Sequence, residues 1–243
     1  MKCIRQNRLR RQQLLGSALL LGLLAACSDA GHDADLQRNA LPLKVGSAGT
    51  CSVELVKVNY DNPGSDNAEY IELQVHSSGT TVTTLGACGL SGIELRDGAA
   101  ANCGSYRSIP LASTPIPNDR RVVICAKGSG PAQLNLCDVV VDTSGAELLQ
   151  NGPGDAIIFF GGVSNTRTAQ VAYEGLGGGC FNGPPEFLTT EDDSAPDKVN
   201  VWCPGGFEAL TGVAPRAPYT CPNADAGADS AADVGVFDAG TGV

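Results

Sequence analysis

The chain has 243 residues, of which 16 are Lys or Arg and 26 are Asp or Glu, so its formal net charge at pH 7 is −10. A negative field of this kind repels phosphate backbones, and no basic patch with interleaved aromatic residues occurs, which argues against nucleic-acid binding. With only two His residues, the chain is also short of the usual catalytic bases.

The first 26 residues have the pattern of an export signal. Five basic side chains fall in residues 1–11, and an apolar run follows from Leu14 to Ala26, which is too short to span a bilayer comfortably. The run ends in Leu24-Ala25-Ala26-Cys27, which resembles a bacterial lipobox. The resemblance implies cleavage before Cys27 and attachment of a diacylglycerol to its sulfur. The alternative is an ordinary secretory signal followed by a chance Cys.

A lipid anchor would decide where the protein lies. Several acyl chains on one residue hold a protein stably on a membrane. The residue after Cys27 is Ser28 rather than Asp, which by analogy with known sorting signals favours the outer membrane of a Gram-negative bacterium, on its periplasmic or its surface face. Loss of residues 1–26 leaves 11 basic and 26 acidic residues, a net charge of −15.

The rest of the chain divides into three parts. Residues 27–50 are small and polar and predict a flexible tether. Residues 51–221 are long enough for one domain with a core. Residues 222–243 are dominated by Ala, Gly and Asp and predict a disordered acidic tail. Asp recurs there at every fourth position, but a calcium array, the alternative, needs rigid turns at tight spacing.

Eight Cys residues remain in the domain once Cys3 is removed and Cys27 is lipidated. An even set in an exported chain predicts four disulfides. Zinc binding is the rival interpretation, but no C-x-x-C pair occurs and His is scarce. Short loops favour the pairs Cys88–Cys103, Cys125–Cys137 and Cys180–Cys203, with Cys51–Cys221 joining the two ends of the domain.

The domain is rich in short β-branched runs flanked by Gly, Pro, Asn or Asp, and no helical period persists for long. In residues 69–75, Glu69, Ile71, Leu73 and Val75 alternate with Tyr70, Glu72 and Gln74, which is typical of a half-buried strand. Many short strands predict an all-β fold of the β-sandwich type. The runs are residues 52–58, 69–75, 80–85, 92–96, 121–126, 138–142, 155–160 and 167–173.

The order of several segments resembles a lamin tail domain. The similar parts are a first strand at Val53–Tyr60, an acidic Pro-Gly turn at Asp61–Asp66, a strand with two Glu at Glu69–Leu73, a segment at Val82–Leu90, and later stretches at residues 105–125 and 149–175. The resemblance covers roughly residues 52–175 and implies an immunoglobulin-like sandwich. Residues 176–221 and the disulfides go beyond the family pattern.

The turn between the first two strands gathers acidic side chains around Pro63-Gly64. Pro sets φ for one turn position and Gly tolerates the next, which predicts a solvated hairpin corner with Glu69 at its water-accessible end. The alternative is a weak calcium site formed by Asp61, Asp66 and Glu69, because carboxylate oxygens suit that ion. We expect no other cofactor.

Catalytic motifs such as G-x-S-x-G, H-E-x-x-H and the P-loop are missing from the sequence. We therefore expect a non-enzymatic, membrane-anchored module that binds or scaffolds an envelope protein or polysaccharide, with β-augmentation at a free strand edge as one route. One alternative is a hydrolase, or its accessory subunit, with His76 and Glu69 as candidate bases. The other is a carbohydrate-binding module that stacks sugars on aromatic residues. Its candidates are Trp202, Tyr219, Phe207 and Tyr106.

Overall fold

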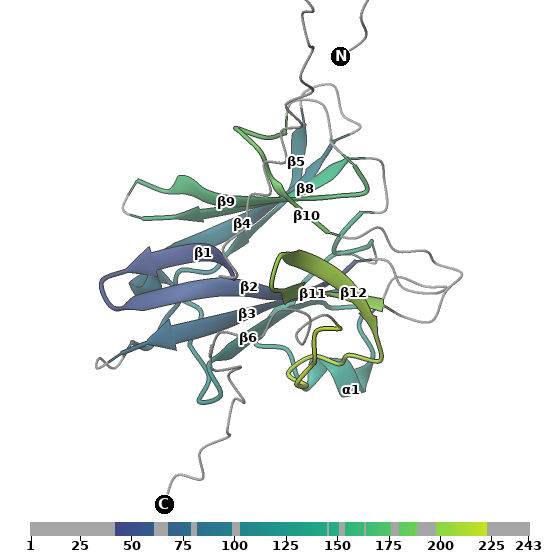
Figure 1. The fold of residues 1–243 in the computed structure, drawn as a ribbon, viewed down its shortest axis with the longest axis horizontal. Helices are drawn as coiled ribbons and strands as arrows, with labels where there is room; N and C mark the ends of the chain where they lie inside the picture. Colours follow the sequence, from purple (N-terminus) through teal and green to yellow (C-terminus); the bar gives the residue numbers. More distant parts are fainter. Residues whose placement is uncertain are drawn as a thin grey trace, which may run out of the picture. The chain divides into compact units, whose positions relative to one another are not determined.

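The computed structural model describes residues 42–60, 68–78, 82–98, 103–144, 146–150, 154–162, 164–175, 180–188 and 198–222. They form two β-sheets that pack face to face, as Figure 1 shows. The predicted all-β sandwich is therefore confirmed, while its immunoglobulin-like type stays a prediction. Among the described residues no helix is long and apolar enough to cross a membrane.

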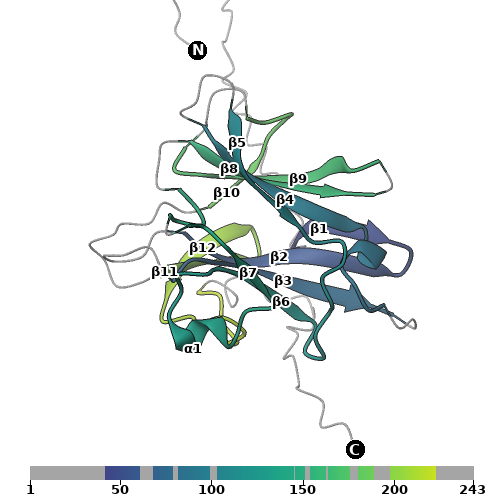
Figure 2. The same ribbon diagram turned by 180° about the vertical axis from the view of Figure 1, so that it is seen from behind.

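The larger sheet is built around β2 and β3. Its strands follow the order β12-β11-β2-β3-β6-β7, and β1 also pairs with β2. β7 runs parallel to β6, which Figure 2 shows from behind. The strands of this sheet are β1 (Leu43–Ala48), β2 (Cys51–Asn59), β3 (Tyr70–Ser77), β6 (Arg121–Ala126), β7 (Val139–Val141), β11 (Lys198–Cys203) and β12 (Gly206–Thr211).

One edge of β2 is shared by two partners. β1 pairs Leu43 with Leu55, and β11 pairs Val201 with Lys57, while β3 takes the opposite edge along the full length of β2. A bulge lies between Leu55 and Lys57. β1 and β11 therefore follow one another along the same edge and meet beside Val56.

The smaller sheet has the order β10-β9-β8-β4-β5. Its central pairs are antiparallel, and only the short β10 runs parallel to its neighbour β9. Its strands are β4 (Leu90–Asp97), β5 (Gly104–Pro110), β8 (Asp155–Gly161), β9 (Thr166–Tyr173) and β10 (Glu186–Phe187). Two short helices complete the described elements, namely η1 (Gly86–Cys88) and α1 (Pro131–Leu134).

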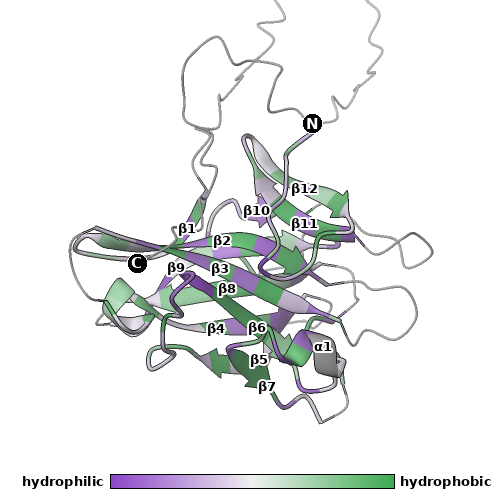
Figure 3. Ribbon diagram, turned by 90° about the horizontal axis from the view of Figure 1, so that it is seen from below, coloured by the Kyte–Doolittle hydropathy of each residue, from purple (hydrophilic) through white to green (hydrophobic). Residues whose placement is uncertain are grey.

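The main core lies between the two sheets. Leu55 and Leu73 of the larger sheet and Ile157 and Phe159 of the smaller one are fully buried members of a single apolar cluster. Successive side chains of a strand point to opposite faces, so alternate positions supply this core. Figure 3 shows apolar and polar residues alternating along several of these strands.

The outer faces of both sheets are also covered. On the larger sheet, residues 213–221 pack with Tyr70, Val123 and Val201 in a second apolar cluster; we name residues 213–221 the C-terminal strap. On the smaller sheet, Phe181 and the Cys103–Cys180 pair lie against Ile158. The prediction that β3 is only half buried is therefore wrong, because the strap buries its second face as well.

All eight Cys residues of the domain are joined in four disulfides: Cys51–Cys88, Cys103–Cys180, Cys125–Cys137 and Cys203–Cys221. Of the expected pairs, only Cys125–Cys137 is present. The expected pairs Cys88–Cys103, Cys180–Cys203 and Cys51–Cys221 are wrong, because the sandwich brings distant segments together where sequence spacing favours near ones.

The folded part begins earlier than the sequence indicates. β1 lies inside residues 27–50, so the predicted tether is wrong for residues 43–50. The run at residues 80–85 forms no strand in its described part; Thr84 makes one isolated bridge to Pro115 before η1. Residues 176–221, whose structure the sequence left open, supply β10, β11, β12 and the C-terminal strap.

Candidate functional site

A groove of about 230 Å³ lies over the outer face of β2, β3 and β6, beside the point where β1 and β11 meet on the edge of β2. The β2–β3 register shifts at Val56, and Pro42 and Pro204, which flank β1 and β11, donate no backbone hydrogen bond. We name this hollow the seam groove. It is lined by Pro42, Glu54, Val56, Glu72, Gln74, His76, Arg121, Trp202, Pro204 and Tyr219.

Trp202 and Tyr219 border the seam groove from different sides of the larger sheet. The Trp202 ring lies in the main core, where it packs edge-on against Phe207 with ring centroids 5.0 Å apart. The Tyr219 hydroxyl donates a 2.9 Å hydrogen bond to the carbonyl of Trp202, which fixes the C-terminal strap to the end of β11. Burial raises the pKa of Tyr219 to about 12, so the hydroxyl stays neutral.

A buried ion cluster lies beneath the C-terminal strap, at one side of the groove. Lys57 Nζ donates to Glu72 Oε2 at 3.0 Å, and both side chains are fully buried. The same ammonium donates to the carbonyls of Ala214 and Ala217, and Arg121 pairs with the second oxygen of Glu72 at 3.2 Å. Burial lowers the pKa of Lys57, while the Glu72 charge acts in the opposite direction. Every charge here has a partner of opposite sign.

The other end of the groove is polar and more accessible. His76 Nε2 lies 2.8 Å from Glu54 Oε2, with side chains 42% and 15% exposed. The hydrogen bond to Glu54 raises the pKa of His76, and burial opposes this shift. Gln74 stands opposite Glu54 in the β2–β3 register, and its amide donates to the carbonyl of Arg120 at 3.2 Å. Three planar polar side chains therefore converge at one end of an otherwise largely apolar groove.

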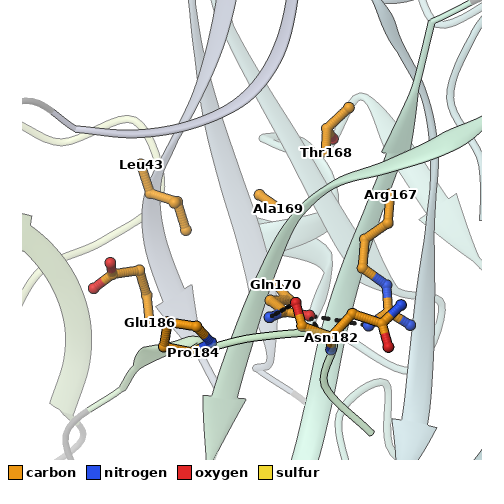
Figure 4. Close-up of a pocket in the computed structure, with 8 residues that line it drawn as sticks. All are labelled: Leu43, Arg167, Thr168, Ala169, Gln170, Asn182, Pro184 and Glu186. Atoms are coloured by element: carbon orange, nitrogen blue, oxygen red, sulfur yellow. Dashed lines mark hydrogen bonds between the residues drawn. The ribbon is translucent and has the colours of Figure 1, made fainter.

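A second hollow, of about 280 Å³, lies beside β9 and β10 (Figure 4). Its main polar side chains are occupied with one another. Gln170 accepts from Asn182 N and donates to the carbonyls of Asn182 and Gly183, while Arg167 donates to Gln170 and to the carbonyl of Cys180. These bonds fasten residues 180–183 onto β9, so this hollow is explained by the packing of that segment.

The expected calcium ligand Glu69 has a different role. It is fully buried, and its Oε2 accepts backbone hydrogen bonds from Leu148 and Leu149. The expectation that water reaches Glu69 is therefore wrong. Asp61 and Asp66 lie outside the described residues, as does Cys27. Within the described ranges, no three His, Cys, Asp or Glu side chains are grouped so that they could hold a metal ion.

The candidate hydrolase bases do not come together. His76 follows Glu69 by seven residues along an extended strand, a distance of roughly 23 Å at about 3.3 Å per residue. Glu69 shares the inward face with Ile71, whereas His76 lies on the opposite face beside Glu54. The structure therefore gives no shared site to this pair.

The four aromatic candidates for sugar stacking also separate. Phe207 is buried in the main core and Tyr106 hydrogen-bonds the Tyr173 hydroxyl at 3.2 Å, away from the seam groove. Trp202 and Tyr219 both border the groove, but the Trp202 ring is buried in the main core together with Phe207, so Tyr219 is the aromatic side chain that the groove can present. Sequence reasoning missed Glu54 and Gln74 as its companions, although the alternation in residues 69–75 places Gln74 on the same face as Glu72.

In comparisons with known proteins, no protein-family model, no curated protein and no solved structure matches this chain.

Proposed function

We propose that this chain is an exported lipoprotein, held by lipid on Cys27 at the outer membrane of a Gram-negative bacterium, whose lamin-tail-like sandwich is a non-enzymatic binding or scaffolding module. The observation that carries the proposal is the pairing of all eight domain cysteines in four disulfides. Disulfides at this density form and persist in oxidising compartments outside the cytosol.

The seam groove supports a binding role. Its walls are fixed before any ligand arrives, since the C-terminal strap is tied down by Cys203–Cys221 and by the bond from Tyr219 to Trp202. Binding groups that are already ordered lose little conformational entropy on association. The partner would be an envelope protein or a polysaccharide.

A free strand edge offers a second surface for the same role. Among the described strands, β5 pairs only with β4, so its outer edge faces away from the sheet. An extended segment of a partner protein could add to such an edge.

Two measurements test the proposal. The full chain is expressed in a Gram-negative host, and mass spectrometry of its membrane fraction should find an N-terminal peptide that begins at diacylated Cys27. A specific envelope component should then be captured by the wild-type protein and lost with Glu54→Arg in the groove or with Arg107→Pro on β5. An unmodified amino terminus, or free thiols in the purified domain, would contradict export and anchoring.

A further inference from the structure

We infer that the seam groove binds a neutral carbohydrate, with the sugar hydroxyls at the Glu54, Gln74 and His76 end and its apolar face against Val56, Pro204 and Tyr219. This inference deepens the proposed function and rests on it, because it assigns a ligand class to the same groove.

The charges of the groove favour a neutral ligand. Glu54 is paired with His76, and Glu72 with both Lys57 and Arg121. A charged ligand would have to displace one of these partners and leave the other unpaired in a partly buried place, which is costly. A hydroxyl group can instead add to the remaining lone pairs of a carboxylate without breaking its ion pair.

The chemistry of the polar end fits hydroxyl groups in particular. A hydroxyl both donates and accepts, and it needs partners that together do both. Glu54 accepts, the Gln74 amide combines a donor and an acceptor, and the His76 ring that is paired with Glu54 donates. These side chains come from neighbouring positions on β2 and β3, so the strands hold them at fixed separations.

The opposite wall fits the carbon face of a sugar. Val56, Pro204 and Tyr219 offer apolar surface within the same hollow. A ligand with one apolar face and a hydroxyl rim satisfies both ends at once. Pockets for drug-sized molecules hold roughly 300–1,000 Å³, so a groove of about 230 Å³ seats one sugar unit of a longer glycan.

The protein carries its own reporter of this binding. Trp202 is the only Trp of the chain, and its carbonyl accepts the hydrogen bond from the Tyr219 hydroxyl at the groove, so its fluorescence emission reports a ligand that contacts Tyr219. The full-length protein in detergent is titrated with oligomers of N-acetylglucosamine, glucose and mannose and with glycan fragments from Gram-negative envelopes. We expect a saturable emission change with at least one glycan.

Substitutions in the seam groove test whether the glycan binds there. Glu54→Gln and His76→Ala should each weaken glycan binding about tenfold or more, because the first replaces a charged acceptor by a neutral one and the second removes a donor. Glu94→Gln is the matched control, since Glu94 is half-buried and paired with Arg96 on the smaller sheet. It should leave glycan binding unchanged. Melting curves of all three variants establish that the fold is retained.

Three outcomes overturn the inference. The first is that no glycan of the panel changes the emission. The second is that glycan binding survives in the Glu54→Gln/His76→Ala double variant. The third is that a proline-rich or basic peptide saturates the groove and that Glu54→Gln and His76→Ala weaken the binding of this peptide. None of them affects the acylation of Cys27 or the capture of an envelope component through β5, so failure here is distinguishable from failure of the proposed function.

Discussion

Asp155 opens β8 with a carboxyl group that is 1% exposed. Its Oδ1 accepts a 2.9 Å hydrogen bond from Gly98 N, and its Oδ2 is buried without a hydrogen-bond partner among the described residues. Burial raises the pKa of Asp155 to about 6, with smaller contributions from the charges of Asp97 and Glu174. The ionised form is therefore disfavoured in the folded protein.

This shift predicts a pH-dependent effect of Asp155→Asn. The folded protein holds the proton more tightly than the unfolded chain, so the wild type loses stability as pH rises from about 4 through 6. An amide keeps the acceptor for Gly98 and never ionises. We expect Asp155→Asn to raise the free energy of unfolding by roughly 1–2 kcal/mol at pH 8, but not at pH 4. Urea unfolding at the two pH values measures this.

Asp142 provides a control, because its pKa is shifted in the opposite direction to that of Asp155. This carboxylate is exposed, and its hydrogen bond from Lys127 lowers its pKa. Asp142→Asn should therefore be neutral at low pH and slightly destabilising at pH 8. If both variants follow the same pH trend, the assigned burial of Asp155 is wrong.

The Lys57–Glu72 pair predicts a large loss of stability when only one of its two members is replaced. Both side chains are fully buried, so removing one partner strands the other charge away from water. Glu72→Leu should lower the free energy of unfolding by about 3–5 kcal/mol. The double variant Lys57→Met/Glu72→Leu should recover part of this loss, because no unpaired ammonium remains. It should not recover all of it, since the carbonyl of Ala214 loses its Lys57 donor and the carbonyl of Ala217 keeps only Arg121. A double-mutant cycle in urea tests this, and additive losses would contradict it.

At the scale of elements, the C-terminal strap is held by one disulfide and by several buried contacts. Cys203–Cys221 closes a short loop, and Tyr70 and Tyr219 donate hydrogen bonds that tie the strap to the sheet. Replacing both cysteines by Ala should lower the free energy of unfolding by roughly 3 kcal/mol, mainly by freeing the unfolded chain. Hydrogen exchange should then quicken first in residues 213–221 and in β3.

Cys103–Cys180 gives the matched comparison. It spans 77 residues against 18 for Cys203–Cys221, so its removal should cost roughly 4 kcal/mol. The exchange of residues 213–221 should stay slow in that variant, because the strap lies on the other sheet. Equal loss of protection in the strap with either disulfide removed would show that the strap is not a separate unit.

The strands that sequence predicts best are those with strong local patterns. β2, β3, β6 and β8 combine β-branched residues with alternation or an apolar run, and these features depend on neighbours in sequence. β1 and β5 contain Gly, Ser or Pro and rely on a partner strand for their order, so their local pattern is weak. β11 does alternate, with Val199 and Val201 on one face and Trp202 on the other, and this signal could have been used.

The candidate site depends on contacts that sequence does not encode locally. Glu72 looks like a solvent-facing residue in its own strand and is buried only because residues 213–221 cross over it. Glu69 is likewise buried by backbone groups of Leu148 and Leu149, far along the chain. Tyr219 could be named from sequence, but its place in one groove with Glu54 and His76 follows from the path of residues 213–221 across the larger sheet.

At the scale of the whole molecule, anchoring and folding should be separable. The eight domain cysteines pair with one another, so the domain needs no sulfur from Cys27. The chain after residue 26 carries a net charge of −15, and anionic membrane surfaces repel such a protein. The acyl chains would then be the main force that holds the domain at the membrane.

We therefore expect Cys27→Ser to release the protein from the membrane without unfolding its domain. Cell fractionation should find the wild type with the outer membrane, resistant to washing with high salt because the attachment is not electrostatic. The variant should appear in the soluble exported fraction, with an unchanged melting temperature and four intact disulfides by mass spectrometry. As a control, Ser28→Ala keeps Cys27, the proposed site of acylation, and should stay with the membrane. A Cys27→Ser protein that remains in the membrane fraction after the salt wash would mean that another part of the chain holds the protein there.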